Sequence, residues 1–132
     1  MWKFVFAFPL IMHGLANLAG FFEAFSKAPH SFNDKPWIFS PGVKLQSGIG
    51  RLFGLLWLLS TICLVGAGVA LIFQQSWWAL AATGGAVCSL LAIVPWWNTV
   101  VPGARFAVFF DLAVIAVLLS PLREQIEQLI GK

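Results

Sequence analysis

Residues 48–97 read GIGRLFGLLWLLSTICLVGAGVALIFQQSWWALAATGGAVCSLLAIVPWW, and this stretch decides the fold. It holds two apolar runs, each near the ~20 residues that a helix needs to cross about 30 Å of hydrocarbon. Only residues 74–76, Gln-Gln-Ser, separate them. Tryptophan pairs at 77–78 and 96–97 bracket the second run, as aromatic residues do at the two faces of a bilayer. The stretch therefore predicts an antiparallel hairpin of two transmembrane helices.

The composition extends this prediction to the whole chain. Of its 132 residues, 60% are hydrophobic and only 10% are charged, whereas about a quarter of a soluble domain is charged. So few charges cannot cover the surface of a water-soluble protein, so lipid must be the solvent for much of the surface of this chain. We expect a single-domain, all-α, polytopic integral membrane protein: a four-transmembrane-helix bundle with a short C-terminal amphipathic helix. The helices are expected at about 2–25, 48–73, 77–97 and 104–119, with an interfacial loop at 26–46 and an amphipathic tail at 120–132.

The first expected helix opens like a secretory signal peptide, with Lys3 ahead of an apolar run. The apolar character continues to Phe25, so we expect a retained transmembrane helix. Pro9 should remove one of its backbone hydrogen bonds and kink it. The loop that follows combines prolines with aromatic residues, which favours a segment lying in the headgroup layer. These residues are Pro29, Pro36, Pro41, Phe32, Trp37 and Phe39.

The tail carries the start and stop residues of a helix of its own. Ser120 suits the N-cap, Pro121 the first helical position and Gly131 the stop. Four residues at i, i+4, i+7 and i+8 form one apolar face. They are Leu122, Ile126, Leu129 and Ile130. We favour an interfacial amphipathic helix over an extension of the fourth helix, because Pro121 interrupts the hydrogen-bond ladder.

Several classes of site are disfavoured. The net charge of +3 is spread along the chain, so nucleic acid is not an expected partner. Cys63 and Cys88 lie in separate apolar runs without a C-x-x-C motif, which argues against a zinc site or a dithiol centre. We expect their Cα atoms to lie too far apart for a disulfide. No metal, cofactor or catalytic residue is predicted.

Ionisable and amide side chains inside the expected helices are the candidate functional residues, because such groups are costly in hydrocarbon. His13 and Asn17 are four residues apart and share one helix face. The candidates are His13, Asn17, Glu23, Arg51, Arg105 at the surface, and Asp111.

Depth below the long loop, at about 1.5 Å per residue, orders these candidates. Glu23 and Arg51 lie near the surface, whereas Asp111, Asn17 and His13 follow at about 10, 13 and 20 Å. This order predicts a polar funnel descending to His13, with Asp111 meeting the first helix near Asn17 and Arg51 lying above it. The structural alternative pairs Glu23 with Arg51 at the interface and pins Asp111 by a hydrogen bond from Asn17.

Two motifs carry a resemblance to known proteins: residues 13–21 read HGLANLAGF, and residues 50–58 read GRLFGLLWL. Both resemble a widespread group of small bacterial membrane proteins, which often have a second histidine at the position of Asn17. More distantly, the layout resembles the DoxX-like four-helix families, some of which are accessory subunits of membrane redox systems. The resemblance implies an auxiliary role in a bacterial cytoplasmic (inner) membrane and offers no catalytic residue.

Three functions follow as hypotheses. The leading one is a non-enzymatic accessory or assembly subunit, with the bilayer and either a membrane protein partner or further copies of itself as partners. The second is a proton-linked or small-solute transporter or channel, built as an oligomer around His13, Asn17 and Asp111. The third is a membrane enzyme acting on a lipid or quinone, with His13 or Asp111 as the acid–base group. Of these three functions, the enzyme is the least expected.

Overall fold

The computed structural model describes residues 1–27, 32–33, 37–40 and 42–131. Within these ranges every regular element is a helix, so the all-α prediction is confirmed for them. The elements are α1 (Trp2–Phe25), α2 (Gly48–Ile72), α3 (Trp78–Ile93), the short 3-10 helix η1 (Val94–Trp96), α4 (Pro102–Leu118) and α5 (Leu122–Leu129).

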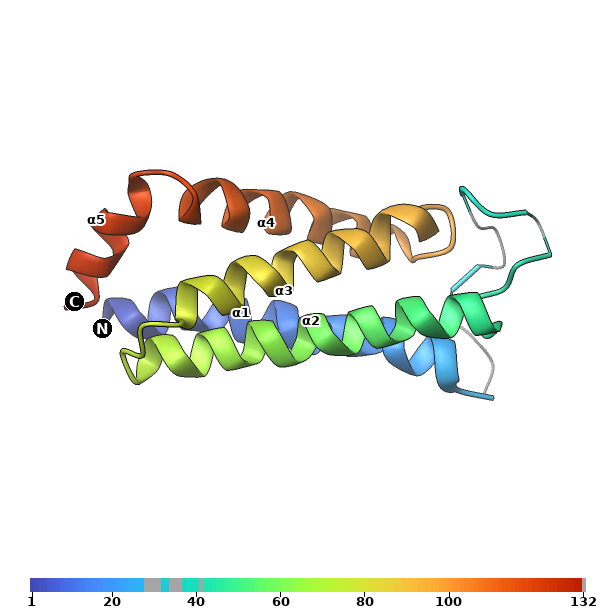
Figure 1. Cartoon of the computed structure of the whole chain (residues 1–132), viewed down its shortest axis with the longest axis horizontal. Helices are drawn as coiled ribbons and strands as arrows, with labels where there is room; N and C mark the ends of the chain where they lie inside the picture. Colours follow the sequence, from blue (N-terminus) through green and yellow to red (C-terminus); the bar gives the residue numbers. More distant parts are fainter. Residues whose placement is uncertain (28–31, 34–36, 41, 132) are drawn as a thin grey trace.

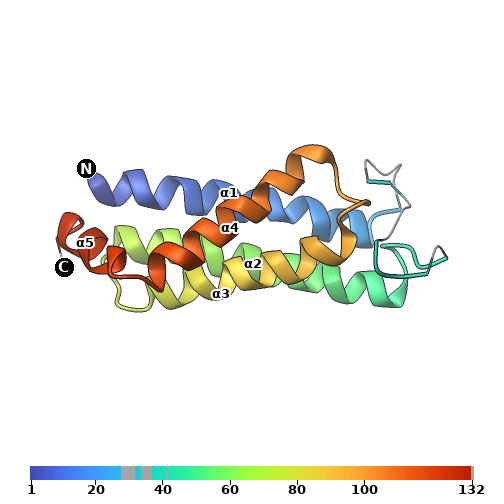
Figure 2. The same cartoon turned by 90° about the horizontal axis from the view of Figure 1, so that it is seen from above.

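The helices form an elongated bundle with the N-terminus and α5 at one end and the long loop at the other (Figure 1). Helix α1 packs along α2, α2 packs along α3, and α3 packs against α4. Helix α4 runs obliquely across the bundle (Figure 2) and makes almost no backbone approach to α1. The contact between α1 and α4 is therefore the weakest of the contacts between neighbouring helices.

Three segments are long and apolar enough to span a membrane: Trp2–Phe25, Gly48–Ile72 and Trp78–Trp96. Helix α4 has 17 residues and extends about 25 Å, less than the hydrocarbon thickness. It qualifies as a fourth span only together with α5, from which it is bent by 87°. Large apolar side chains point outward from the bundle, among them Phe73, Leu80 and Phe106 at 70%, 78% and 73% exposure. An apolar surface of this kind suits lipid and not water.

Glycines allow α1 and α2 to approach closely. A Cβ atom at Gly20 would lie 2.2 Å from the indole of Trp57, and one at Gly14 would lie 2.9 Å from the side chain of Leu64. Small residues at helix interfaces are typical of membrane bundles, where dispersion forces drive association. The indole of Trp57 can therefore cross the α1–α2 interface at the level of Gly20.

The long loop folds back on the bundle instead of lying apart from it. The ring of Phe39 stacks 5.1 Å from Trp96, and the backbone N–H of Asn33 donates to the carbonyl of Thr99 at 2.8 Å. Trp37 alone of the described loop aromatics is mainly exposed, at 55%. Pro29, Pro36 and Pro41 of the predicted interfacial loop lie outside the described residues.

The connection between α3 and α4 is also folded inward. Pro95 falls in the 3-10 turn that ends α3, and Pro102 occupies the first turn of α4, where a missing N–H costs nothing. Trp96, Thr99 and Val100 between them are 0%, 2% and 1% exposed. The connection that leads into α4 is therefore buried, whereas Pro102 and Gly103 at the start of α4 are exposed.

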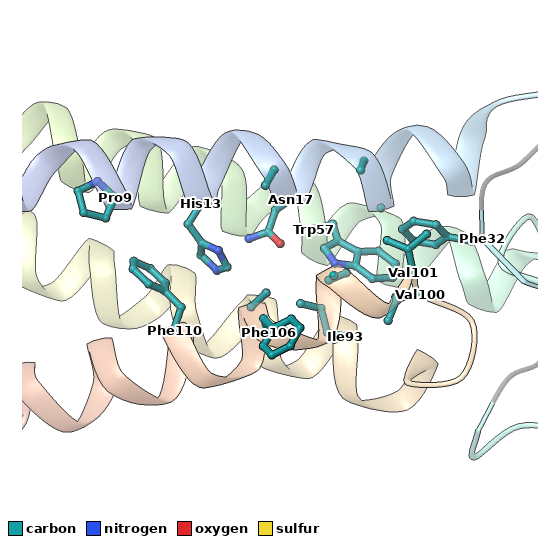
Figure 3. Close-up of a pocket in the computed structure, with 16 residues that line it drawn as sticks. Pro9, His13, Asn17, Phe32, Trp57, Ile93, Val100, Val101, Phe106 and Phe110 are labelled. Atoms are coloured by element: carbon teal, nitrogen blue, oxygen red, sulfur yellow. The ribbon is translucent and has the colours of Figure 1, made fainter.

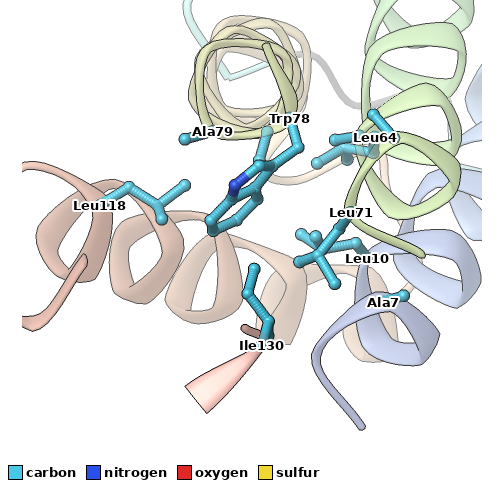
Figure 4. Close-up of a cluster of buried hydrophobic side chains, with 11 residues drawn as sticks. Ala7, Leu10, Leu64, Leu71, Trp78, Ala79, Leu118 and Ile130 are labelled. Carbon is cyan, nitrogen blue, oxygen red and sulfur yellow. The ribbon is translucent and has the colours of Figure 1, made fainter. Parts of the chain in front are cut away.

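Helix α5 is a separate helix, but it packs against the bundle with part of its apolar face. Ile130 is 5% exposed and joins the cluster formed by Leu71 and Trp78 (Figure 4). Leu122 and Leu129 of the predicted apolar face remain about half exposed. The apolar face of this tail, which was expected to lie on the bilayer, thus packs against the bundle at Ile130 and stays partly exposed at Leu122 and Leu129.

The turn after α2 holds α5 in this position. Gln74 has a positive φ of 57°, and the N–H groups of Gln74 and Gln75 donate to the carbonyls of Leu71 and Ala70. This pattern is the Schellman motif that ends many helices. The side-chain amide of Gln74 donates to the carbonyl of Ile130 at 2.7 Å, which ties the end of α5 to the α2–α3 hairpin.

Candidate functional site

A cavity of about 540 Å³ lies between α1 and α4, where the two helices stay apart (Figure 3). Its walls are almost wholly apolar or aromatic, and His13 and Asn17 are the polar side chains among them. Helix α1 contributes one wall, helix α4 the other, and Trp57, Ile93 and Phe32 close the side and the loop end. The lining residues on the two principal walls are Pro9, His13, Ala16, Asn17, Ala19 and Gly20 of α1, and Gly103, Ala104, Phe106, Ala107 and Phe110 of α4.

His13 and Asp111 form the polar contact across this gap. Nε2 of His13 lies 2.8 Å from Oδ1 of Asp111, and the side chain of Asp111 is completely buried. The ring of Phe110 lies 4.5 Å from the imidazole, so the pair has an apolar surround. This hydrogen bond joins the side chains of α1 and α4, and the ring contact with Phe110 lies beside it.

The second ring nitrogen of His13 has no hydrogen-bond partner among the described residues, and His13 lines the cavity with 11% of its side chain exposed. The second oxygen of Asp111, Oδ2, is buried and has no partner among them either. A histidine that uses Nε2 for one bond keeps Nδ1 as either a donor or an acceptor, according to its protonation. His13 can therefore form one further hydrogen bond with a molecule in the cavity.

Asn17 is engaged within the protein. Its amide nitrogen donates to the hydroxyl of Ser60 at 2.9 Å and lies 3.3 Å from that of Ser89. The hydroxyl of Ser60 in turn donates to the carbonyl of Gly85 at 2.8 Å. Asn17 thus joins α1 to α2 and α3, and its hydrogen-bonding capacity is largely used by the fold.

The remaining candidates lie away from His13. Arg51 is exposed and lies 5.8 Å from the ring of Phe25, and within the described ranges no ion pair joins it to Glu23. The backbone carbonyl of Glu23 accepts a hydrogen bond from Gln46 at 2.9 Å. Neither residue lines the cavity. Between the loop and His13, Asn17 is the polar side chain in the cavity wall, so the cavity is not lined by the charged residues that the expected polar funnel includes, Glu23 and Arg51.

Asp111 meets α1 one turn deeper than expected, at His13 and not at Asn17. The expected depth of Asp111 assumed a connection at the membrane surface, whereas Trp96, Thr99 and Val100 of that connection are buried among the helices. The serines that satisfy Asn17 were missed, because a lone serine in an apolar helix is a weak feature of a sequence. Ser60 and Ser89 are both 0% exposed, and only the helix packing reveals them.

No group of three or more metal-ligating side chains occurs among the described residues. The chain matches no family model, no curated protein and no solved structure. Its function must therefore be inferred from the cavity itself.

Proposed function

We propose that this chain is a four-helix transmembrane protein that binds a lipophilic small molecule in the cavity between α1 and α4, with His13 as its polar anchor. The observation that carries the proposal is an apolar cavity of about 540 Å³ whose wall presents a buried His13–Asp111 pair. Pockets for small molecules typically measure 300–1,000 Å³ and combine apolar walls with a few well-placed polar groups.

The position of the cavity favours entry from lipid. Phe106, on its α4 wall, is 73% exposed, and Ala16 and Ala19, on its α1 wall, are exposed as well. The cavity therefore opens on the apolar flank of the bundle. A ligand dissolved in the bilayer would enter sideways between α1 and α4 without crossing a polar surface.

The weak contact between α1 and α4 supports the same proposal. Separating these helices breaks one side-chain hydrogen bond and few close contacts, whereas separating α1 from α2 would disrupt glycine-mediated packing along their whole length. The gap can widen to admit a ligand at a low cost.

Location in a bacterial inner membrane and an accessory role beside a protein partner stay predictions of the sequence, and ligand binding is compatible with both. The transporter and enzyme hypotheses stay predictions as well. Each of these would use the same cavity, so occupancy is the property to measure first.

The test measures the lipophilic molecules that stay bound to two variants, each of which carries an Ala→Phe change at a different position of α4. The chain is purified in mild detergent, extracted with organic solvent and examined by mass spectrometry. Ala107→Phe fills the cavity from α4, and Ala116→Phe places the same ring on the exposed side of α4, away from the cavity. We expect a stoichiometric apolar molecule with the wild type and Ala116→Phe, and its loss with Ala107→Phe at an unchanged melting temperature. Equal retention by both variants would contradict the proposal.

A further inference from the structure

A second, smaller cavity of about 220 Å³ continues the first toward the other end of the bundle. Pro9 of α1 and Phe110 of α4 line both cavities. The smaller one runs between Phe6 and Val114 to Ile126 of α5. Trp78 and Leu118 also line it, next to Ile126 of α5, and Gln74 holds the end of α5 at this end of the bundle. The two cavities thus adjoin at Pro9 and Phe110 between α1 and α4, the larger one toward the loop end and the smaller one toward α5.

His13 lies close to the point where the larger cavity adjoins the smaller one. It is one helical turn from Pro9 on α1, and its ring lies 4.5 Å from that of Phe110. A single ligand that fills both cavities would therefore pass its middle, and not its end, beside the imidazole. The polar atom of such a ligand would lie between a broad group and a narrow one.

The charge of the His13–Asp111 pair indicates which polar atom fits. A net charge in this apolar surround would be costly, so the pair is favoured in a form with no net charge. Two such forms place a hydrogen on Nδ1: imidazolium with carboxylate, and neutral imidazole whose Nε2 accepts from a carboxyl group protonated on Oδ1. A third form, with Nε2–H donating to Oδ1 and the carboxyl hydrogen on Oδ2, is disfavoured because Oδ2 is buried and has no partner among the described residues, so its hydrogen would be unpaired. His13 then presents a donor to the cavity and matches a ligand that offers an acceptor.

We propose that the ligand is an uncharged ring compound with a carbonyl oxygen next to the ring and a single apolar chain. Its carbonyl accepts a hydrogen bond from Nδ1–H of His13, its ring lies in the larger cavity, and its chain lies in the smaller cavity toward α5. The ring stacks with the aromatic residues of the larger cavity, Phe32, Trp57, Phe106 and Phe110. This inference rests on the proposed function, since it names the class of ligand for the same cavity.

Three matched probes test the polar contact: octanophenone, 1-phenyloctan-1-ol and octylbenzene. They share a phenyl ring and an alkyl chain and differ in the oxygen beside the ring. Binding to the full chain in lipid nanodiscs is measured by titration calorimetry, with empty nanodiscs subtracted to remove partitioning into lipid. We expect octanophenone to bind about tenfold more tightly than octylbenzene, which is the typical effect of one buried hydrogen bond.

The double variant His13→Phe/Asp111→Leu tests whether His13 makes this contact. It removes both members of the pair and leaves no unpaired partner behind, so the fold is retained. The preference for octanophenone over octylbenzene should fall from about tenfold to near unity. A preference that persists in the double variant would show that another group recognises the oxygen and would overturn the assignment to His13.

Chain length tests the smaller cavity. Ala113→Phe fills it from α4, and Ala116→Phe is the matched control outside it. Ala113→Phe should weaken octanophenone severalfold and leave acetophenone, which has no long chain, unchanged. Equal weakening of both ketones would overturn the placement of the chain.

The three probes distinguish a failure of the proposed function from a failure of the inference about the carbonyl group. If none of the three probes binds beyond empty nanodiscs, the proposed function fails. If octylbenzene binds as tightly as octanophenone and Ala107→Phe blocks both, the cavity binds apolar molecules but the carbonyl inference fails. If 1-phenyloctan-1-ol binds more tightly than octanophenone, Nδ1 of His13 acts as an acceptor and the inference is again overturned.

Discussion

Removing His13 and removing Asp111 should have unequal effects on stability. His13→Phe leaves the fully buried carboxyl group of Asp111 without its partner, and Oδ2 already lacks one among the described residues. A buried polar group left without its partner typically costs about 1–3 kcal/mol when it is neutral, and breaking a buried charged pair from one side costs about 3–5 kcal/mol. Asp111→Leu leaves only a histidine that is 11% exposed and faces a cavity, so we expect a loss of about 1 kcal/mol, the usual value of one hydrogen bond.

The double variant should be close to the wild type. Phe and Leu are apolar and somewhat larger than the residues they replace, and the cavity beside His13 offers room for the added volume. Replacing both members of a buried pair with apolar residues is often neutral. If the single changes cost about 3 and about 1 kcal/mol, an additive double would lose about 4 kcal/mol. We expect a loss under about 1 kcal/mol, which corresponds to a coupling energy of about 3 kcal/mol between the two positions.

The measurement is reversible unfolding by SDS in mixed micelles, followed by the loss of helical circular dichroism. Asp111→Asn is the control, because its amide oxygen can keep the hydrogen bond with His13, and it should cost less than about 1 kcal/mol. Additive costs for the two single variants, with a coupling below about 0.5 kcal/mol, would show that the pair is not a stabilising contact and would refute the reasoning.

Two further predictions concern packing. Gly20→Val should destabilise the bundle by about 1–3 kcal/mol, because its side chain would overlap the indole of Trp57; Gly84→Ala, where an added Cβ meets nothing within 4 Å, should be neutral or slightly stabilising in the same SDS titration. Replacing the free and partly buried Cys63 and Cys88 together with Ala should change the unfolding free energy by about 1 kcal/mol or less and leave ligand binding intact; a loss of binding at retained stability would indicate thiol chemistry that the fold does not suggest.

The helices could be predicted from the sequence because lipid imposes a strong requirement on it. A spanning segment must form its backbone hydrogen bonds internally and present apolar side chains to the lipid. Each helix therefore corresponds to a continuous apolar run in the sequence. The first helix ends at Phe25, as expected, and the second begins at Gly48. The third ends early, at Ile93, because Pro95 turns the chain into a 3-10 helix.

The site could be predicted only in part, because the relative depths of helices depend on their connections. His13, Asn17 and Asp111 were identified as polar groups in the membrane interior, but their pairing depends on where α4 starts. Residues 94–101 read VPWWNTVV, and apolar residues of this kind suit a headgroup layer as well as a protein interior, so the sequence does not indicate which of the two surrounds this connection. The cavity could not be predicted from the sequence either. A gap between α1 and α4 depends on how the helices pack, and it leaves no pattern in the sequence of either helix.

The loose seam between α1 and α4 has a consequence for how the protein is made. In the proposed transmembrane arrangement, α1, α2 and α3 would enter the membrane first during synthesis and could form their glycine-mediated contacts before α4 leaves the ribosome. Helix α4 is short and carries Asp111 near its middle, and an aspartate there opposes insertion by about 2.5–3.5 kcal/mol. His13, already in the membrane, offers that aspartate a partner. The first helix to be translated would thus act as the receptor for the last, and a substitution at His13 should lower the fraction of chains in which α4 is inserted at all.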